Sequence, residues 1–212
     1  RALPELAEIR DEGGSLFIGA LTSHAAIEDG RAFGSNGDPT NGLLRKVARG
    51  IAYRAVRNRG TIGGSLAHAD PAADWVSAMA LLDAGIVIRG AAGERIVPAS
   101  QFVLGVMTTA LAADEVIAGV RVPKLSTRAR WSYWKFCRKT GEFAEAIAGF
   151  VVDPARDWHR AVMGATEGAP IVVADARHLD AAAVAATAYA RGTYEHQVHQ
   201  VALKRAAEAL GA

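Results

Sequence analysis

The segment between residues 70 and 84 most limits the folds open to this chain. Asp70 is a residue type that caps helices, and Pro71 suits a first helical position. Trp75, Met79 and Leu82 then recur at intervals of three and four residues, which is typical of one helix face. The spacing predicts a helix over 70–84 whose apolar stripe packs in a core.

Short apolar runs bounded by glycine or proline lie on both sides of that helix, and such runs predict strands. Between two of them, Gly90 and Gly93 frame a turn that predicts a hairpin. The expected strands cover residues 16–18, 86–88, 95–97, 116–122, 131–138, 146–152 and 161–164.

The helices and strands are segregated along the chain, which favours an α+β architecture. A Pro-Lys-Leu-Ser-Thr stretch at 123–127 interrupts two strands and is typical of a linker. We therefore expect one domain over residues 1–124 and a second over 129–212. Further helices are expected at 23–27, 43–48, 181–191 and 198–210, and a turn-rich loop at 34–42.

Composition excludes several classes of protein. The 212 residues carry a formal net charge of +2, and their basic residues are scattered, which argues against nucleic-acid binding. No apolar run approaches the roughly 20 residues of a membrane-spanning helix, so no membrane span is expected. Cys137 is the single cysteine, which excludes an intrachain disulfide and an iron–sulfur cluster held by this chain alone. We expect a reducing, cytoplasmic setting.

Residues 61–65, Thr-Ile-Gly-Gly-Ser, form the segment with the clearest chemical potential. Adjacent glycines between Thr61 and Ser65 let backbone N–H groups approach an anion without an intervening side chain, as pyrophosphate binding requires. A bare Gly-Gly is, however, more often a tight turn. The spacing alone leaves both alternatives open.

Three segments are informative together because of their order. Residues 56–67 read VRNRGTIGGSLA and are followed by PAAD at 71–74. Residues 114–123 contain DEVI and then VRVP, and residues 133–141 read YWKFCRKTG. These segments resemble V-R-N-x-G-T-I-G-G-N-L-x with P-x-x-D, the D/E-E-I-I/L and I-x-I-P strand, and F-x-K-x-x-R-R/K-x-G-D. Those are motifs of the FAD-binding medium subunit of molybdenum hydroxylases of the xanthine dehydrogenase and carbon monoxide dehydrogenase type, and the resemblance extends over nearly the whole chain.

The resemblance implies a set of flavin-binding residues in the glycine segment. Thr61, Gly63 and Gly64 would hold the flavin pyrophosphate, and Ile62 would line the same loop. Ser65 stands where the family usually has Asn. Its hydroxyl still donates to a phosphate, but it cannot span the loop as an amide does.

Three residues outside that segment are also implied by the resemblance. Asp74 would accept a hydrogen bond from a ribityl or ribose hydroxyl, because a carboxylate offers only acceptors. Lys135 would lie near the isoalloxazine and stabilise the reduced flavin, and Ile117 would contact the adenine or flavin region. Simpler explanations exist for each: an acidic residue in a first helical turn, a solvated lysine and an apolar core residue.

The resemblance also implies a fold and a function. The expected fold is α+β, with a PCMH-type FAD-binding domain followed by a small C-terminal α+β domain like that of carbon monoxide dehydrogenase flavoprotein. The family's other flavin loop would precede Arg1, so the first subdomain is expected to be missing. The expected function is that of an oxidoreductase subunit that carries FAD and passes electrons from iron–sulfur clusters to an external acceptor.

The same resemblance implies partners. These are a large subunit with the molybdopterin cofactor and a small subunit with 2Fe-2S clusters. Two alternatives remain open: a stand-alone flavoenzyme of the same fold, and a non-catalytic assembly subunit that has lost flavin.

Other reactive side chains give weaker signals. His196 and His199 have helical spacing but lack the acidic or cysteine partner of a metal site, so we expect them on a helix surface. Cys137 falls in an expected strand, which favours a buried structural thiol. Neither a G-x-S-x-G nucleophile turn nor a G-x-G-x-x-G segment after a strand occurs.

Overall fold

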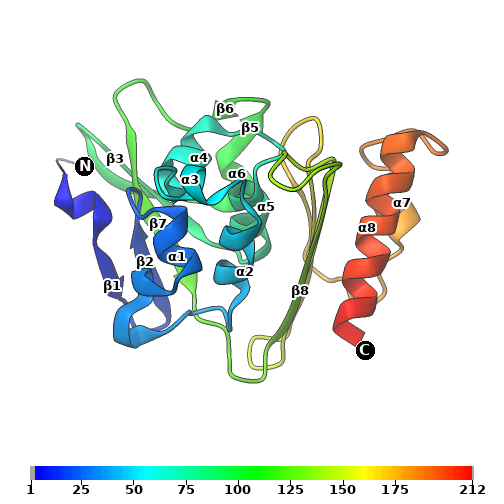
Figure 1. The fold of residues 1–212 in the computed structure, drawn as a ribbon, viewed down its shortest axis with the longest axis horizontal. Coiled ribbons are helices and arrows are strands. Elements are labelled where there is room, and N and C mark those ends of the chain that lie inside the picture. The colour runs from blue at the N-terminus through cyan, green and yellow to red at the C-terminus, as the bar shows by residue number, and fades with distance from the viewer. Residues whose placement is uncertain (1–2, 212) are drawn as a thin grey trace.

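Five antiparallel strands form the first sheet of the computed structural model, which describes residues 3–211 (Figure 1). The strand order is β1-β2-β7-β3-β4, so β7 occupies the centre although it is the last of these five strands along the chain. A separate hairpin pairs β5 with β6. The strands are β1 (Ile9–Asp11), β2 (Ser15–Gly19), β3 (Gly85–Gly90), β4 (Gly93–Pro98), β5 (Val103–Gly105), β6 (Thr108–Thr109) and β7 (Val116–Pro123).

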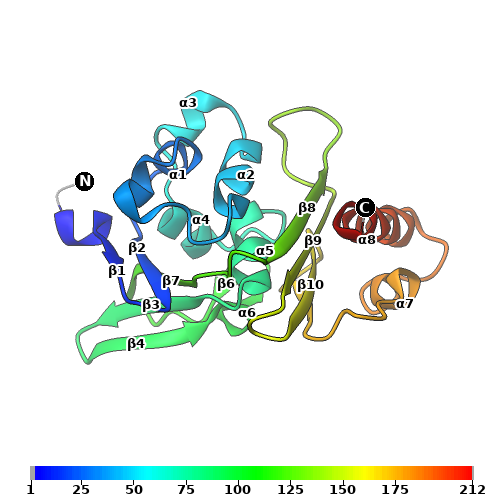
Figure 2. The ribbon, with the colours of Figure 1, turned by 90° about the horizontal axis from the view of Figure 1, so that it is seen from below.

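A second antiparallel sheet has the order β11-β10-β9-β8. It stands between the helices of the first half of the chain and the two C-terminal helices, α7 and α8, as both views show (Figure 2). Its strands are β8 (Arg130–Phe136), β9 (Ala146–Asp153), β10 (Trp158–Gly164) and β11 (Ile171–Val173).

Helix α5 lies between the two sheets. It contacts α2 and α4 on one side and β9 and β10 on the other, whereas α8 packs on the outer face of the second sheet (Figure 2). The helices are α1 (His24–Glu28), α2 (Leu43–Gly50), α3 (Arg54–Arg57), α4 (Ile62–His68), α5 (Asp74–Leu81), α6 (Ala99–Phe102), α7 (Ala181–Ala185) and α8 (Tyr194–Gly211), with 3-10 turns η1 (Pro4–Ala7) and η2 (Arg31–Asn36).

The main hydrophobic core joins both sheets through α5. Every residue of α5 is buried. Trp75 and Met79 belong to one cluster with Val120 of the first sheet and Val162 of the second. Each fully buried large apolar side chain contributes about 1.5–3 kcal/mol. The predicted apolar stripe is therefore confirmed, and it packs in two directions.

Several element boundaries differ from the expected ones. The helix predicted from residue 70 begins at Asp74, because Asp70 accepts from the backbone N–H groups of Ala72 and Ala73 and so closes a turn before the helix. The helix expected over 181–191 ends at Ala185. The last helix begins at Tyr194, earlier than predicted, and the Thr193 hydroxyl accepts from the N–H of its first turn.

The expected linker connects the two sheets. Strand β7 ends at Pro123 and β8 begins at Arg130. Ser126, in this linker, donates its backbone N–H and its hydroxyl to the fully buried carboxylate of Asp153, at 2.9 and 2.6 Å. The division into domains at 124 and 129 stays a prediction, since the core cluster runs across both parts. Within residues 3–211 no helix has the length and apolarity needed to cross a membrane.

Gly164 allows the second sheet to approach α5 closely. A Cβ at this position would overlap the Ser77 hydroxyl and lie 2.9 Å from Ser77 Cβ, and Ser77 is fully buried. We expect Gly164→Ala to lower the free energy of unfolding by about 1–3 kcal/mol, the usual effect of overpacking. Urea denaturation of the variant measures this. Gly168→Ala is the matched control, because nothing lies within 4 Å of its added carbon; equal stabilities of the two variants would contradict the packing argument.

Candidate functional site

A cavity of about 350 Å³ opens where the first half of the chain meets β8. It takes residues from α1, the turn after α2, α3, α4, α5, β8 and the β8–β9 loop. Three of the predicted site residues, Ser65, Asp74 and Lys135, line it together. The complete lining is His24, Ile51, Ala52, Val56, Ser65, Ala73, Asp74, Lys135, Gly141, Glu142 and Phe143.

Asp74 and Lys135 form a buried ion pair at this cavity. Lys135 Nζ lies 2.7 Å from Asp74 Oδ2, and the side chains are 13% and 5% exposed. Tyr133 donates its hydroxyl to Asp74 Oδ1 at 3.2 Å. Burial raises the pKa of Asp74, and the charge of Lys135 acts against this rise. The attraction between the two charges at hydrogen-bond distance therefore offsets the cost of removing both groups from water.

Lys135 is held by a second contact, since its Nζ also donates to the carbonyl of Gly50 at 3.1 Å. The ammonium thus joins β8 to the end of α2 as well as to α5. Tyr133, two residues earlier on the same strand face, has a pKa raised well above its usual value by burial and by the Asp74 carboxylate. The tyrosine is consequently a hydrogen-bond donor at neutral pH.

His24 is a buried histidine in the cavity wall, 5% exposed. Trp75 Nε1 lies 3.0 Å from its Nδ1. Burial lowers the pKa of His24 to about 4, and the nearby Arg57 guanidinium acts in the same direction. The imidazole is therefore neutral at pH 7.

The glycine segment forms the beginning of a helix in place of an open loop. Thr61 caps α4, and its hydroxyl oxygen accepts from Gly64 N at 3.1 Å. The N–H groups of Ile62 and Gly63 donate to the carbonyls of Thr22 and Ala20, and Ser65 N donates to Thr61 O. All four N–H groups are thus bonded within the chain, so a free nest of donors is not present in this conformation.

The residues of this segment differ in burial and in their neighbours. Ile62 is fully buried and Gly63 packs against Ala20, so these two residues hold the helix on the end of β2. Gly64 is exposed, and Ser65 is half-buried in the cavity wall. The flavin-binding roles implied for Thr61, Ile62, Gly63, Gly64 and Ser65 stay predictions.

Ile117 lies apart from this cavity. It sits in β7, opposite Ile88 of β3, and belongs to the main core. Its side chain is 6% exposed and is not part of the cavity lining. Its implied contact with the adenine or flavin region stays a prediction.

An ionic network holds the part of the cavity wall that follows α2. Arg57 pairs with Glu28 at 2.8 Å, and both side chains are 12% exposed. Its Nη1 donates to the carbonyls of both Ile51 and Ala52 at 2.9 Å. Arg57 of the V-R-N motif thus fixes the turn that lines the cavity, a role that the motif alone did not indicate.

Sequence reasoning missed several residues of the cavity. His24 and Ile51 line the cavity, and Tyr133 supports it through Asp74; the three come from segments far apart in the chain, so no local spacing connects them. The one available signal was the alternation of Tyr133 with Lys135, which places both on one face of a strand.

Two expectations about reactive side chains are wrong. His196 and His199 are buried, 6% and 1% exposed, because α8 turns them toward α7 and the end of β10. Cys137 is half-buried and follows the last residue of β8. In the part of the chain that the structure describes, no three His, Cys, Asp or Glu residues gather as a potential metal site.

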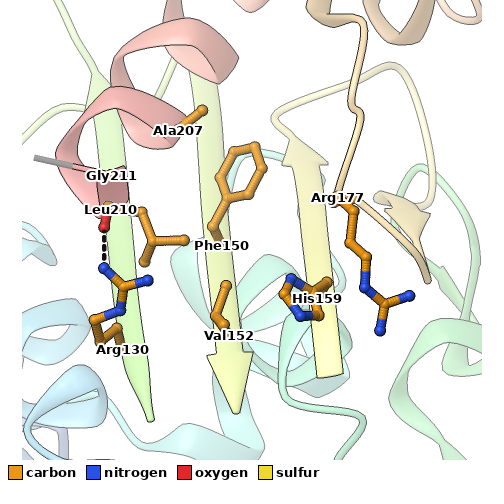
Figure 3. A pocket seen from close by; sticks show the side chains of 9 residues that line it. Arg130, Phe150, Val152, His159, Arg177, Ala207, Leu210 and Gly211 are labelled. Atoms are coloured by element: carbon orange, nitrogen blue, oxygen red, sulfur yellow. Dashed lines mark hydrogen bonds between the residues drawn. The ribbon is translucent and has the colours of Figure 1, made fainter. Parts of the chain in front are cut away.

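A second cavity, of about 220 Å³, lies on the outer face of the second sheet beside the end of α8 (Figure 3). Arg130 donates to the carbonyl of Leu210 at 2.8 Å, and Arg177 pairs with Asp157 and Asp175. None of the predicted site residues lines this cavity. Its two guanidinium groups are engaged, so the first cavity is the better candidate.

Gly63 provides a test of how α4 is seated. A Cβ there would overlap the Ala20 side chain and lie 2.8 Å from the Ala20 backbone, whereas one at Gly64 would meet only the Thr61 hydroxyl at 3.0 Å. We expect Gly63→Ala to destabilise the fold by about 2–3 kcal/mol and Gly64→Ala by clearly less. Thermal or chemical unfolding measures both. A Gly63→Ala variant as stable as Gly64→Ala would mean that α4 is not packed against Ala20 in solution.

His24 should make stability depend on pH. Its folded pKa of about 4 lies below the ordinary 6.5, so the unfolded chain takes up the proton first as the pH falls. The neutral ring therefore makes its full contribution to the free energy of unfolding above pH 6.5. This contribution, about 3 kcal/mol, is lost as the pH falls from 6.5 to about 4. His24→Gln should flatten the pH dependence of unfolding in this window. Parallel wild-type and variant curves would refute the burial of a neutral His24.

Comparison with known proteins supports the likeness seen in the sequence. The family described as "FAD binding domain in molybdopterin dehydrogenase" matches residues 1–125. The carbon monoxide dehydrogenase medium chain of Hydrogenophaga pseudoflava is 40% identical over 150 residues, which cover 71% of this chain and 51% of that protein. The 6-hydroxypseudooxynicotine dehydrogenase complex subunit alpha of Paenarthrobacter nicotinovorans is 35% identical over 150 residues, covering 71% and 49%. The chain spans about half the length of the curated relatives it matches.

Solved structures extend the likeness to the C-terminal half. The structure of carbon monoxide dehydrogenase from Hydrogenophaga pseudoflava that lacks the Mo-pyranopterin moiety matches with a TM-score of 0.85 at 29% identity, covering 98% of this chain and 79% of that one. Quinoline 2-oxidoreductase from Pseudomonas putida 86 matches with a TM-score of 0.77 at 28% identity, covering 99% and 80%. The α+β fold class is confirmed. The chain belongs to the family of FAD-binding domains of molybdopterin dehydrogenases.

Proposed function

We propose that this chain is the FAD-carrying part of a molybdenum-containing hydroxylase and that the cavity at Asp74 and Lys135 receives the flavin ring. The observation that carries the proposal is the convergence of Ser65, Asp74 and Lys135 on one cavity from three separate elements. Its volume of about 350 Å³ lies at the small end of ligand pockets, which suits the ring portion of a dinucleotide better than the whole molecule.

The residues present fit a flavin chemically. Lys135 brings a cation to the cavity, and a cation near the ring stabilises the charge of the reduced form. The Ser65 hydroxyl makes no hydrogen bond to residues 3–211, so it is available to a ligand. The walls at Ile51 and Phe143 are apolar, as a flat aromatic ring requires. When bound, the flavin supplies the chemistry of accepting and passing on electrons.

Asp74 has a positioning function in this proposal. Its two carboxylate oxygens accept from Lys135 and Tyr133, and each oxygen keeps a further lone pair for a sugar or ribityl hydroxyl. The carboxylate therefore orients the ammonium first and contacts the ligand second. Without Asp74, Lys135 would lack the countercharge that compensates its burial.

The remaining parts of the proposal concern the assembly. The relatives include the medium chain of carbon monoxide dehydrogenase, so we propose a large molybdopterin subunit and a small 2Fe-2S subunit as partners. Electrons would pass from the clusters to the flavin and on to an external acceptor. The single cysteine agrees with cluster ligands from another chain and with a cytoplasmic setting, and both belong to the proposal.

One observation favours a second candidate, an assembly subunit that no longer binds flavin. The N–H groups of residues 62–65 are all bonded within the chain, so a pyrophosphate would have to displace the bond from Gly64 to Thr61. The hydroxyl protons of Thr61 and Ser65 would then be the first donors to the phosphate. Flavin titration distinguishes the two candidates.

Lys135→Met tests the flavin proposal in the protein expressed at its full natural length. We expect wild type to bind FAD and the variant to bind it at least tenfold more weakly, because the cation beside the ring is lost. Quenching of flavin fluorescence measures Kd. Lys139→Met is the control, since Lys139 is exposed beyond the end of β8. Failure of wild type to bind FAD would support the assembly subunit.

A double variant separates ligand contact from folding. Lys135→Met alone leaves the Asp74 carboxylate buried without its cation, which costs about 3–5 kcal/mol of stability. Adding Asp74→Asn should restore much of the stability and leave FAD binding weak. Recovery of FAD affinity in the double variant would show that Lys135 acts only through the fold.

A further inference from the structure

We propose that His24 is a ligand-contacting residue of the cavity, which donates a neutral hydrogen bond from Nε2 to an acceptor on the bound heterocyclic ring. This inference rests on the proposed function, because the ring in question is that of the flavin. It adds a neutral donor to a cavity that also holds the ammonium of Lys135.

The hydrogen bond to Trp75 determines which nitrogen of His24 carries the proton. An indole N–H is a donor only, so His24 Nδ1, at 3.0 Å from Trp75 Nε1, must be the acceptor. A neutral imidazole with an accepting Nδ1 has its proton on Nε2. The tautomer follows from the chemistry of the partner and needs no assumption about hydrogen positions.

The Nε2 edge is available to a ligand. His24 lines the cavity, and its Nε2 makes no hydrogen bond to another residue between 3 and 211. Nε2 is also not among the fully enclosed side-chain atoms of that range that lack a hydrogen-bond partner, such as Thr22 Oγ1 and Ser77 Oγ. A buried polar group is normally hydrogen-bonded, so an unpartnered N–H at a cavity wall indicates a partner supplied from the cavity.

The ring has little freedom to turn away. Trp75 is fully buried in α5 and holds Nδ1 from one side. On the other side, a Cβ at Gly60 would lie 2.7 Å from His24 Nε2, so the backbone at Gly60 is already close to the ring edge. The backbone N–H of His24 donates to the carbonyl of Gly60 at 3.0 Å. The imidazole is therefore preorganised by Trp75 and Gly60, which lowers the entropic cost of ligand contact.

The charged groups around His24 keep it a neutral donor. Arg57 lies close enough to oppose protonation, and its charge is in turn paired with Glu28. Asp74 lines the same cavity but is engaged by Lys135. A neutral N–H suits a carbonyl oxygen or ring nitrogen of a planar heterocycle, whereas the ammonium of Lys135 suits the part of the ring where negative charge develops.

Three variants of the full-length protein test this role. His24→Phe keeps a flat ring without a donor, and His24→Gln keeps a donor. Trp75→Phe removes the indole N–H, so that either nitrogen of His24 can carry the proton. His68→Gln is the control, because His68 is exposed at the end of α4. FAD and ADP are titrated in parallel. ADP contains the adenosine and pyrophosphate of FAD but lacks the ring.

We expect His24→Phe to raise the Kd of FAD about tenfold and to leave the Kd of ADP unchanged, and Trp75→Phe to act in the same direction more weakly. His24→Gln should retain most of the FAD affinity. Equal loss of FAD and ADP binding in His24→Phe, or unchanged FAD binding, would overturn the role of His24 while the flavin proposal stands. Absence of FAD binding in wild type would overturn both.

A second measurement is independent of how well each variant folds. In wild-type protein labelled with 15N-histidine, NMR should show His24 protonated at Nε2 alone, with that resonance moving when FAD is added. His24→Gln assigns the signal. A proton on Nδ1, or a resonance that FAD does not move, would refute the inference.

Discussion

The ion pair between Asp74 and Lys135 is the interaction on which the architecture of the candidate site depends. It joins the first residue of α5 to β8, across the place where the first half of the chain meets the second sheet. A buried pair of this kind contributes little net stability but is strongly destabilising when one partner is removed. Its main effect is geometric, because it holds an ammonium at a defined point of the cavity wall. The contacts of Lys135 with Gly50 and of Tyr133 with Asp74 depend on the same alignment.

Helix α5 links this polar pair to the hydrophobic core. Its eight residues are all buried, so one helix supplies the carboxylate of the pair, the indole that orients His24 and the side chains that join the two sheets. A shift of α5 would move Asp74 and Trp75 together. The packing of α5 therefore fixes the position of Asp74 relative to His24, which Trp75 orients. Short hydrogen bonds then suffice to hold Lys135 and His24 in place.

The sequence was most informative where local pattern decides structure. The hairpin of β3 and β4, the strand β7 and the stripe of α5 were predictable because period and turn residues act within a few positions. The start of α5 was predicted too early because an Asp can either cap a helix or close a turn. In the structure Asp70 closes a turn, and the helix begins four residues later. His199 was misjudged because its burial depends on carbonyls of residues 164 and 165, which no local pattern reveals. Ser65, Asp74 and Lys135 were found only through the family resemblance, and His24 required the tertiary structure.

The origin of the cavity walls has a consequence for how the protein matures. The walls come from residues as distant in the chain as His24 and Lys135, and from helices that are each too short to be stable alone. Contacts of such high sequence separation form late and slowly, after much chain entropy has been lost. A partly folded chain therefore has no cavity. The cavity wall at Lys135 exists only after the second sheet has docked on α5, so the presence of the cavity reports complete folding of the chain.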